Sequence, residues 1–154
     1  MEKAGRDLDG FGFLIPHTEK RRILGSLWTS SIFRNRAPEG KALLTTIVGG
    51  ARDPLTPLLE EAELNRIVQS ELRATMNQQA PPDFSLITRW EKAIPQYLVG
   101  HEKRLGEIEE HTRSLPGIFL TGNAYRGIGF NDCIKAALLL APRVIEHIGR
   151  NSPL

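Results

Sequence analysis

Apolar residues alternate near the start of the chain with the period of two that is typical of β-strands, and a later stretch, Thr45-Thr46-Ile47-Val48, is rich in β-branched residues, which strands also favour. In the first such stretch the alternation places Phe11, Phe13 and Ile15 on one face. A turn is expected between the second and third stretches, where Pro38 and Gly40 interrupt the pattern. The predicted strands form an antiparallel meander and comprise residues 10–16, 23–29 and 41–48.

A helical period replaces the strand pattern after residue 55. Thr56 is expected to cap the helix and Pro57 suits its first position. Glu60 and Glu61 lie in the first turn, where the helix dipole favours acidic side chains. Apolar residues then recur three or four positions apart, which favours packing on a core over a partner-binding groove. They are Leu64, Ile67, Val68, Leu72 and Met76.

The second half of the chain combines short apolar runs with two further helices. Residues 84–90 are a predicted strand. Residues 117–122 are a second one, bounded by glycines as expected for a buried parallel strand. A helix is predicted over residues 100–113, with one face formed by His101, Leu105, Ile108 and Thr112. The last helix begins near Asn131 or Asp132, and Pro142 is expected to kink or end it.

The composition is that of an ordinary globular chain. The 154 residues are 40% hydrophobic and 25% charged, with a net charge of +2. Neither disorder nor nucleic-acid binding is therefore expected. Cys133 is the one cysteine, which favours a reducing, cytoplasmic location. The four histidines are too scattered for a zinc site. The sequence shows no signal peptide and no membrane-spanning run, although a peripheral membrane contact stays open.

The most informative stretch for chemistry is a glycine-rich turn within residues 117–133. Gly122, Gly127 and Gly129 lack side chains and so allow the backbone to approach another group closely. The helix expected to follow would present free N–H groups and the positive end of its dipole, which stabilise negative charge. Turns of this kind also arise for purely structural reasons. The sequence contains no Ser–His–Asp order, no paired carboxylates in a plausible pocket and no phosphate-binding P-loop motif.

Three segments of the chain resemble, in the same order, the C-terminal part of a known enzyme family. They are RAPEGKALLTTIVGGARD from Arg36, RWEKAIPQYLVGH from Arg89 and GNAYRGIGFNDCIKAA from Gly122. The last closely resembles the signature of oxygen-dependent protoporphyrinogen and coproporphyrinogen oxidases of haem biosynthesis, which belong to the flavin amine-oxidase superfamily. The resemblance implies an α/β fold. Residues 1–83 would be the end of a substrate-binding domain and would contain an antiparallel β-meander followed by a helix. Residues 84–154 would be the C-terminal portion of a Rossmann-like FAD-binding domain, with a strand–loop–helix element.

The resemblance also implies a cofactor, a reaction and a set of binding residues. FAD would accept hydride in the oxidation of a porphyrinogen to the porphyrin, and dioxygen would reoxidise the flavin. In the family, one position carries an aromatic ring that lies near the flavin. Three later positions place their backbone against the flavin ring, and the two positions after them begin a helix that faces the flavin. The matching positions, which we predict to bind the cofactor, are Trp90, Ile128, Gly129, Phe130, Asn131 and Asp132. No residue is assigned as catalytic, and no metal is expected.

The G-x-G-x-x-G motif that such flavoproteins use for the FAD pyrophosphate is not found in this sequence. Gly10-Phe11-Gly12 and Gly127-Ile128-Gly129 begin the motif without completing it. The chain is therefore expected to be a C-terminal segment that requires the N-terminal half of the same enzyme. A truncated gene model, a split gene or a degraded copy would each produce such a segment. Two other functions stay open: a fragment of a flavoenzyme that acts on an amine or a carotenoid, and a non-catalytic remnant that binds a partner. Protoporphyrinogen and coproporphyrinogen both remain candidate substrates.

Overall fold

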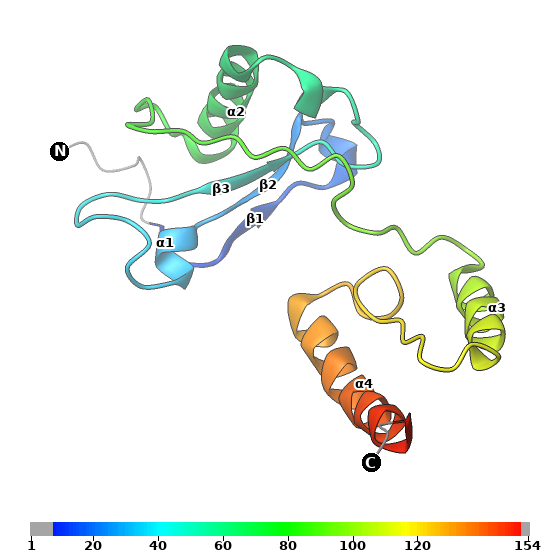
Figure 1. Cartoon of the computed structure of the whole chain (residues 1–154). Helices are drawn as coiled ribbons and strands as arrows, with labels where there is room; N and C mark the ends of the chain where they lie inside the picture. Colours follow the sequence, from blue (N-terminus) through cyan, green and yellow to red (C-terminus); the bar gives the residue numbers. More distant parts are fainter. Residues whose placement is uncertain (1–7, 152–154) are drawn as a thin grey trace. The chain divides into compact units, whose positions relative to one another are not determined.

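The computed structural model describes residues 8–151, and the chain divides into two compact units between Arg89 and Trp90. Each unit has its own set of elements (Figure 1). In the first unit they are β1 (Gly12–Leu14), η1 (His17–Glu19), β2 (Ile23–Leu27), α1 (Thr29–Ile32), β3 (Thr45–Val48), η2 (Thr56–Leu58) and α2 (Glu61–Met76). In the second unit they are α3 (His101–Arg113) and α4 (Phe130–Asn151).

The first unit contains the predicted antiparallel meander, with strand order β1-β2-β3. Gly12 pairs with Leu27, and Ser26 pairs with Thr46. The strands are shorter than expected. The second one ends before Thr29, which starts the short helix α1, and the third begins only at Thr45. The alternation therefore predicted the sheet and its order but not the length of its strands.

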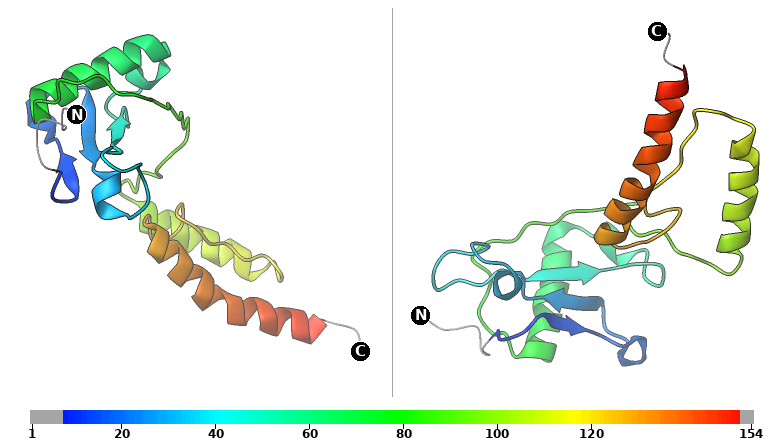
Figure 2. Two further views of the ribbon diagram at one scale, coloured as in Figure 1. Left: turned by 90° about the vertical axis from the view of Figure 1, so that its left-hand side faces the viewer. Right: turned by 90° about the horizontal axis from the view of Figure 1, so that it is seen from below.

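Helix α2 lies over one face of the sheet (Figures 1 and 2) and forms the core with it. This confirms the core-packing role of its apolar face. Phe11 departs from the predicted pattern, since 67% of it is exposed. The backbone is still paired at this position, because the Trp28 amide donates to the Phe11 carbonyl at 3.0 Å, so the departure concerns the Phe11 side chain alone. The core residues are Ile23, Trp28, Leu72 and Met76, with Phe13, Ile15, Leu44, Val48 and Val68 packed against them.

The start of α2 differs from the prediction. Thr56 does not cap the helix. It opens the 3-10 turn η2, and the chain becomes extended at Leu59 before α2 begins at Glu61. The Thr56 amide donates to the Oδ1 atom of Asp53 at 3.1 Å, and Thr56 is itself buried. Hydrogen bonds from the side chain and the backbone of Thr56 lower the pKa of Asp53. Proline at the second residue of η2 suits this short turn as well as it suits a longer helix.

Two predicted strands are wrong. Residues 84–90 and 117–122 adopt no strand conformation in the described structure. Within residues 8–151 no hydrogen bond joins the backbone of residues 119–121 to another strand. The first of these segments is held instead by Arg89, whose guanidinium donates to the carbonyls of Pro57 and Leu59 at 3.0 and 2.9 Å. An apolar run becomes a strand only where a neighbouring strand supplies donors and acceptors.

Helix α4 begins one residue before the predicted start and continues through Pro142 to Asn151. Pro142 therefore does not end the helix. Its ring removes only the bond to the carbonyl of Leu138, and the residues beyond it continue the helical bonding. Helix α3 confirms the other prediction, with Leu105 buried and His101, Ile108 and Thr112 half-buried beside it. None of the helices within residues 8–151 has the length and apolar character needed to cross a membrane.

We expect Leu72→Ala to lower the free energy of unfolding of the first unit by about 2–5 kcal/mol, because it opens a cavity beneath α2. Arg73→Ala, on the exposed side of the same helix, is the matched control and should change stability little. Urea unfolding followed by circular dichroism measures both. Equal stability of the two variants would contradict the assignment of this core.

Candidate functional site

The glycine-rich segment of the second unit folds as two consecutive turns before α4. In the first turn the amides of Tyr125 and Arg126 both donate to the carbonyl of Gly122, at 3.0 and 3.3 Å. Gly122 has a φ of 108°, in a region that side chains disfavour. The sequence Gly-Asn-Ala-Tyr-Arg therefore closes on itself and delivers the chain to Gly127.

The second turn packs Gly127 against the first turn of α4. Gly127 has a φ of 78°, and a Cβ atom on it would lie 2.3 Å from the Cβ atom of Asp132. Non-bonded Cβ atoms essentially never come that close to another atom, so this position requires glycine. The Cys133 thiol also contacts the Gly127 carbonyl at 3.4 Å. Cys133 is half-buried here, in agreement with a packing role.

The N-terminus of α4 presents free backbone donors. Its first helical bond runs from the Cys133 amide to the Gly129 carbonyl at 3.1 Å. Within the described residues, the amides of Phe130, Asn131 and Asp132 have no hydrogen-bond partner. These donors and the helix dipole create a positive end that suits a negatively charged group. The Asp132 carboxylate lies at the same end and moderates its positive potential.

The predicted cofactor-binding residues fall into two groups. Residues 128–132 come together because they form the turn and the start of α4, and all five are exposed. Phe130 is 81% exposed and Ile128 is 42% exposed. Trp90 is 74% exposed, and no hydrogen bond or aromatic contact within residues 8–151 joins it to the turn. A surface of this kind is available to a ligand, and the assignment of these residues to a flavin stays a prediction.

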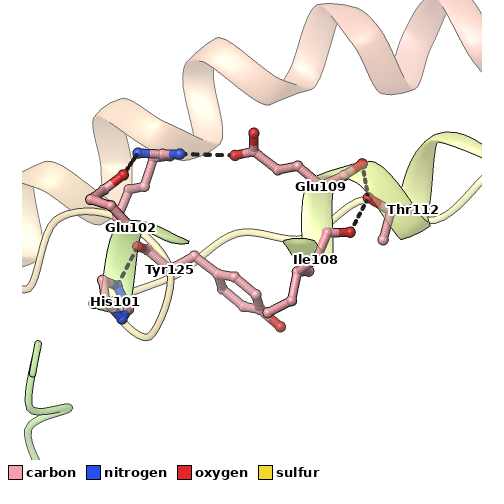
Figure 3. A network of polar contacts seen from close by, with 7 residues as sticks. His101, Glu102, Ile108, Glu109, Thr112 and Tyr125 are labelled. Atoms are coloured by element: carbon pink, nitrogen blue, oxygen red, sulfur yellow. Dashed lines mark hydrogen bonds and ion pairs between the residues drawn. The ribbon is translucent and has the colours of Figure 1, made fainter. Parts of the chain in front are cut away.

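A polar network that the sequence did not predict holds the loop before Gly127 (Figure 3). Arg126 donates to Glu102 at 3.0 Å and to Glu109 at 2.9 Å. The hydrogen bond to Glu109, followed by that to Glu102, raises the pKa of Arg126. His101 bonds to the Tyr125 carbonyl through Nε2 at 3.2 Å. The one hint in the sequence was the spacing of the two glutamates, which places them on the same side of a helix.

A cavity of about 490 Å³ lies within the second unit, beside the turn. It is bounded by α3, by the extended residues 118–122 and by α4, and none of residues 127–132 lines it. Most of its wall is apolar, with three arginines and one glutamate among the lining side chains. They are Arg113, Arg126, Arg143 and Glu109. No group of His, Cys, Asp or Glu side chains in residues 8–151 is arranged to hold a metal ion.

Comparison with known proteins defines the class of this chain. The model of the family described as flavin containing amine oxidoreductase matches residues 2–145, nearly the whole length. This chain belongs to that family. Membership confirms the resemblance drawn from the sequence, and it implies FAD as the cofactor.

The individual relatives are porphyrinogen oxidases. The chain is 37% identical over 134 residues to coproporphyrinogen III oxidase of Bacillus subtilis, covering 84% of this chain and 28% of the relative. It is 34% identical over 148 residues to chloroplastic protoporphyrinogen oxidase of Nicotiana tabacum, covering 94% of this chain and 27% of the relative. A solved structure of a candidate protoporphyrinogen oxidase from Exiguobacterium sp. 255-15 superposes with a TM-score of 0.75 at 26% identity. That superposition covers 90% of this chain and 31% of the solved one.

The chain is therefore short relative to the proteins that it matches. It spans 28% and 27% of the two relatives and 31% of the solved structure. The similarity is nevertheless continuous over most of this chain, which agrees with the order of the three matching segments. The activity of the longer relatives is a property of those whole proteins, and for this chain it is a proposal.

Proposed function

We propose that this chain is the C-terminal part of an FAD-dependent porphyrinogen oxidase of haem biosynthesis, which converts protoporphyrinogen IX or coproporphyrinogen III to the porphyrin with dioxygen as acceptor. The observation that carries the proposal is the turn at Gly127, which leads into three amides at the start of α4 that have no partner within residues 8–151. It occurs in the segment that resembles the porphyrinogen oxidase signature, within a chain of the flavin-containing family. FAD, when bound, supplies the hydride acceptor.

The residues of the turn suit the binding of a flavin ring. Gly129 has no side chain, so the backbone of residues 128–130 can lie flat against a planar group. The free amides at the start of α4 would stabilise the negative charge that a reduced flavin carries. Trp90 supplies a large exposed aromatic surface for the same ring. None of these roles needs an acid or a base in this chain.

We further propose that a second polypeptide segment, equivalent to the rest of the longer relatives, completes the site. Helix α4 has an apolar face that the described residues of the second unit do not cover, and its members recur mostly three or four positions apart. They are Phe130, Ile134, Leu138, Ile145 and Ile148. An exposed apolar face on this scale marks an interaction surface. The segment that covers it would also supply the G-x-G-x-x-G turn that this sequence lacks.

The isolated chain is expected to hold no stoichiometric flavin. The reason is that this sequence contains no G-x-G-x-x-G motif to bind the pyrophosphate at the ADP end of the cofactor. The measurement is the visible absorption spectrum of the chain purified from cells supplied with flavin. A stoichiometric flavin band would contradict the requirement for a second segment.

A chimera tests the function itself. This chain replaces the matching segment of the Bacillus subtilis relative, and the product is assayed for bound flavin and for porphyrin fluorescence with each of the two porphyrinogens. The proposal predicts flavin binding and oxidation of at least one of them. An amine substrate serves as the control for the alternative specificity. A folded chimera that binds no flavin would instead favour the non-catalytic remnant.

A further inference from the structure

Arg126 joins residues 122–126 to two points on α3 that are about two helical turns apart. These residues form the loop before the glycine turn, which begins at Gly127 and leads into α4. One arm of the Arg126 guanidinium donates to the Oε2 atom of Glu102 at 3.0 Å, and the other donates to the Oε1 atom of Glu109 at 2.9 Å (Figure 3). The two glutamates are seven residues apart, about two helical turns, and so lie on one side of the helix. A planar guanidinium can hold both at once, whereas a single ammonium group lacks that fixed fork.

Two further bonds hold the same loop from the chain just before α3 and from its first residue. The Tyr97 hydroxyl donates to the Asn123 carbonyl at 2.6 Å. The Tyr125 carbonyl can only accept, so the Nε2 atom of His101 donates to it at 3.2 Å. The rings of Tyr97 and His101 stack at 4.0 Å, which fixes each donor with respect to the other. Residues 123, 125 and 126 are therefore all anchored, and Gly127 follows directly.

The contribution of this network is geometric rather than energetic. More than half of the side chain of Arg126 is exposed, as are those of Glu102 and Glu109, and ion pairs between exposed groups add little to stability. The two carboxylates outnumber the one guanidinium, and both of its terminal nitrogens already donate. Arg126 is thus an anchored cation and not one that is free to bind an anionic ligand.

We propose that Arg126, Glu102 and Glu109 form a clamp that positions the glycine turn, so that the start of α4 faces the flavin at a fixed angle. The flavin part of this inference rests on the proposed function. The clamp itself is a property of this chain alone. Its members are positioning residues, since they act on the turn and do not touch the reacting atoms.

Amide hydrogen exchange on the isolated chain tests the clamp without any cofactor. The amides of Tyr125, Arg126 and Cys133 are informative, because each is hydrogen-bonded in the turns. Arg126→Gln is expected to speed their exchange by roughly threefold, because exposed ion pairs contribute only a small free energy against local opening. Combined Glu102→Gln and Glu109→Gln should produce the same increase. All three changes together should add nothing more, because the interaction is already lost.

The control is Arg104→Gln, which removes an exposed arginine of α3 that forms no ion pair in the described residues. It should leave the three exchange rates unchanged. Raising the salt concentration to about 1 M should weaken the clamp in the parent chain and not in Arg126→Gln, because screening acts on exposed charges. Unchanged exchange in Arg126→Gln, or effects that simply add, would overturn the clamp.

The chimera with the Bacillus subtilis relative tests the consequence for the flavin. Arg126→Gln should retain the fold but shift the flavin reduction potential and lower kcat, with little change in KM. Arg126→Lys should restore part of the parent behaviour. If Arg126 instead bound an anionic ligand, neutralising the two glutamates would tighten flavin binding, and that result would overturn the positioning role. A parent chimera without flavin would refute the proposed function alone, since the exchange experiment still decides the clamp.

Discussion

Gly129→Val in the chimeric enzyme is expected to abolish flavin binding while the isolated chain that carries it stays folded. Gly129 has an ordinary backbone conformation, unlike Gly127. A Cβ atom there would lie 2.9 Å from the Oδ2 atom of Asp132, which is the end of an exposed and flexible side chain. The chain itself can therefore accommodate the new side chain. A flavin ring packed on this backbone could not.

The stability cost to the isolated chain should be small. Gly129 immediately precedes α4, where glycine is favoured over valine, and the expected loss is about 1 kcal/mol. Gly106→Val is the matched control, because a Cβ atom at Gly106 would meet no atom within 4 Å. It should leave flavin content unchanged. Flavin content is measured on the chimera and urea unfolding on the isolated chain. A flavin-loaded, active Gly129→Val chimera would require the assignment of Ile128, Gly129 and Phe130 to be withdrawn.

The elements that could be predicted from the sequence are those whose pattern is local. The alternation around Phe13 and Ile15 and the β-branched run before Gly49 predicted an antiparallel meander, and the structure contains one. The helical period of α2 and α3 predicted both helices and their buried faces. The period of each of these elements is set by residues that are close together in the sequence, so the pattern alone predicts the element and its buried face, although the core itself joins α2 to the sheet.

The errors arose where the outcome depends on distant residues. Residues 84–90 and 117–122 have the composition of strands, but a strand also needs a partner, and the described residues supply none. Thr56 was predicted to cap a helix and instead accepts a hydrogen bond from Arg22, 34 residues earlier. Arg126 lies 24 residues from Glu102 in the sequence. No periodicity within either segment reveals that the three side chains of the clamp meet.

The three glycines of the glycine-rich segment could not be distinguished from one another by the sequence alone. The sequence marked Gly122, Gly127 and Gly129 alike as positions of close backbone approach. The structure separates them: a Cβ atom on Gly127 would clash with Asp132 in the first turn of α4, one on Gly129 would approach only the end of the Asp132 side chain, and one on Gly122 would meet no atom within 4 Å. Only Gly129 therefore reports on a ligand, and Gly127 reports on the turn itself.

Gly127→Ala is accordingly expected to disrupt the turn in the isolated chain, with no cofactor present. Its φ of 78° costs an alanine about 1–2 kcal/mol. The new Cβ atom, 2.3 Å from the Cβ atom of Asp132, forces a further displacement of the first turn of α4. Gly122→Ala is the matched control, because its φ of 108° imposes backbone strain and its Cβ atom would meet nothing within 4 Å.

The difference between these two variants isolates the steric term. Gly127→Ala should lower the free energy of unfolding of the second unit more than Gly122→Ala does. It should also speed hydrogen exchange at the Cys133 amide, whose bond to Gly129 begins the helix. Equal losses in the two variants would mean that Asp132 does not press on Gly127. In the chimera, Gly127→Ala should lose flavin because the start of α4 has moved, whereas Gly129→Val should lose it with the turn intact.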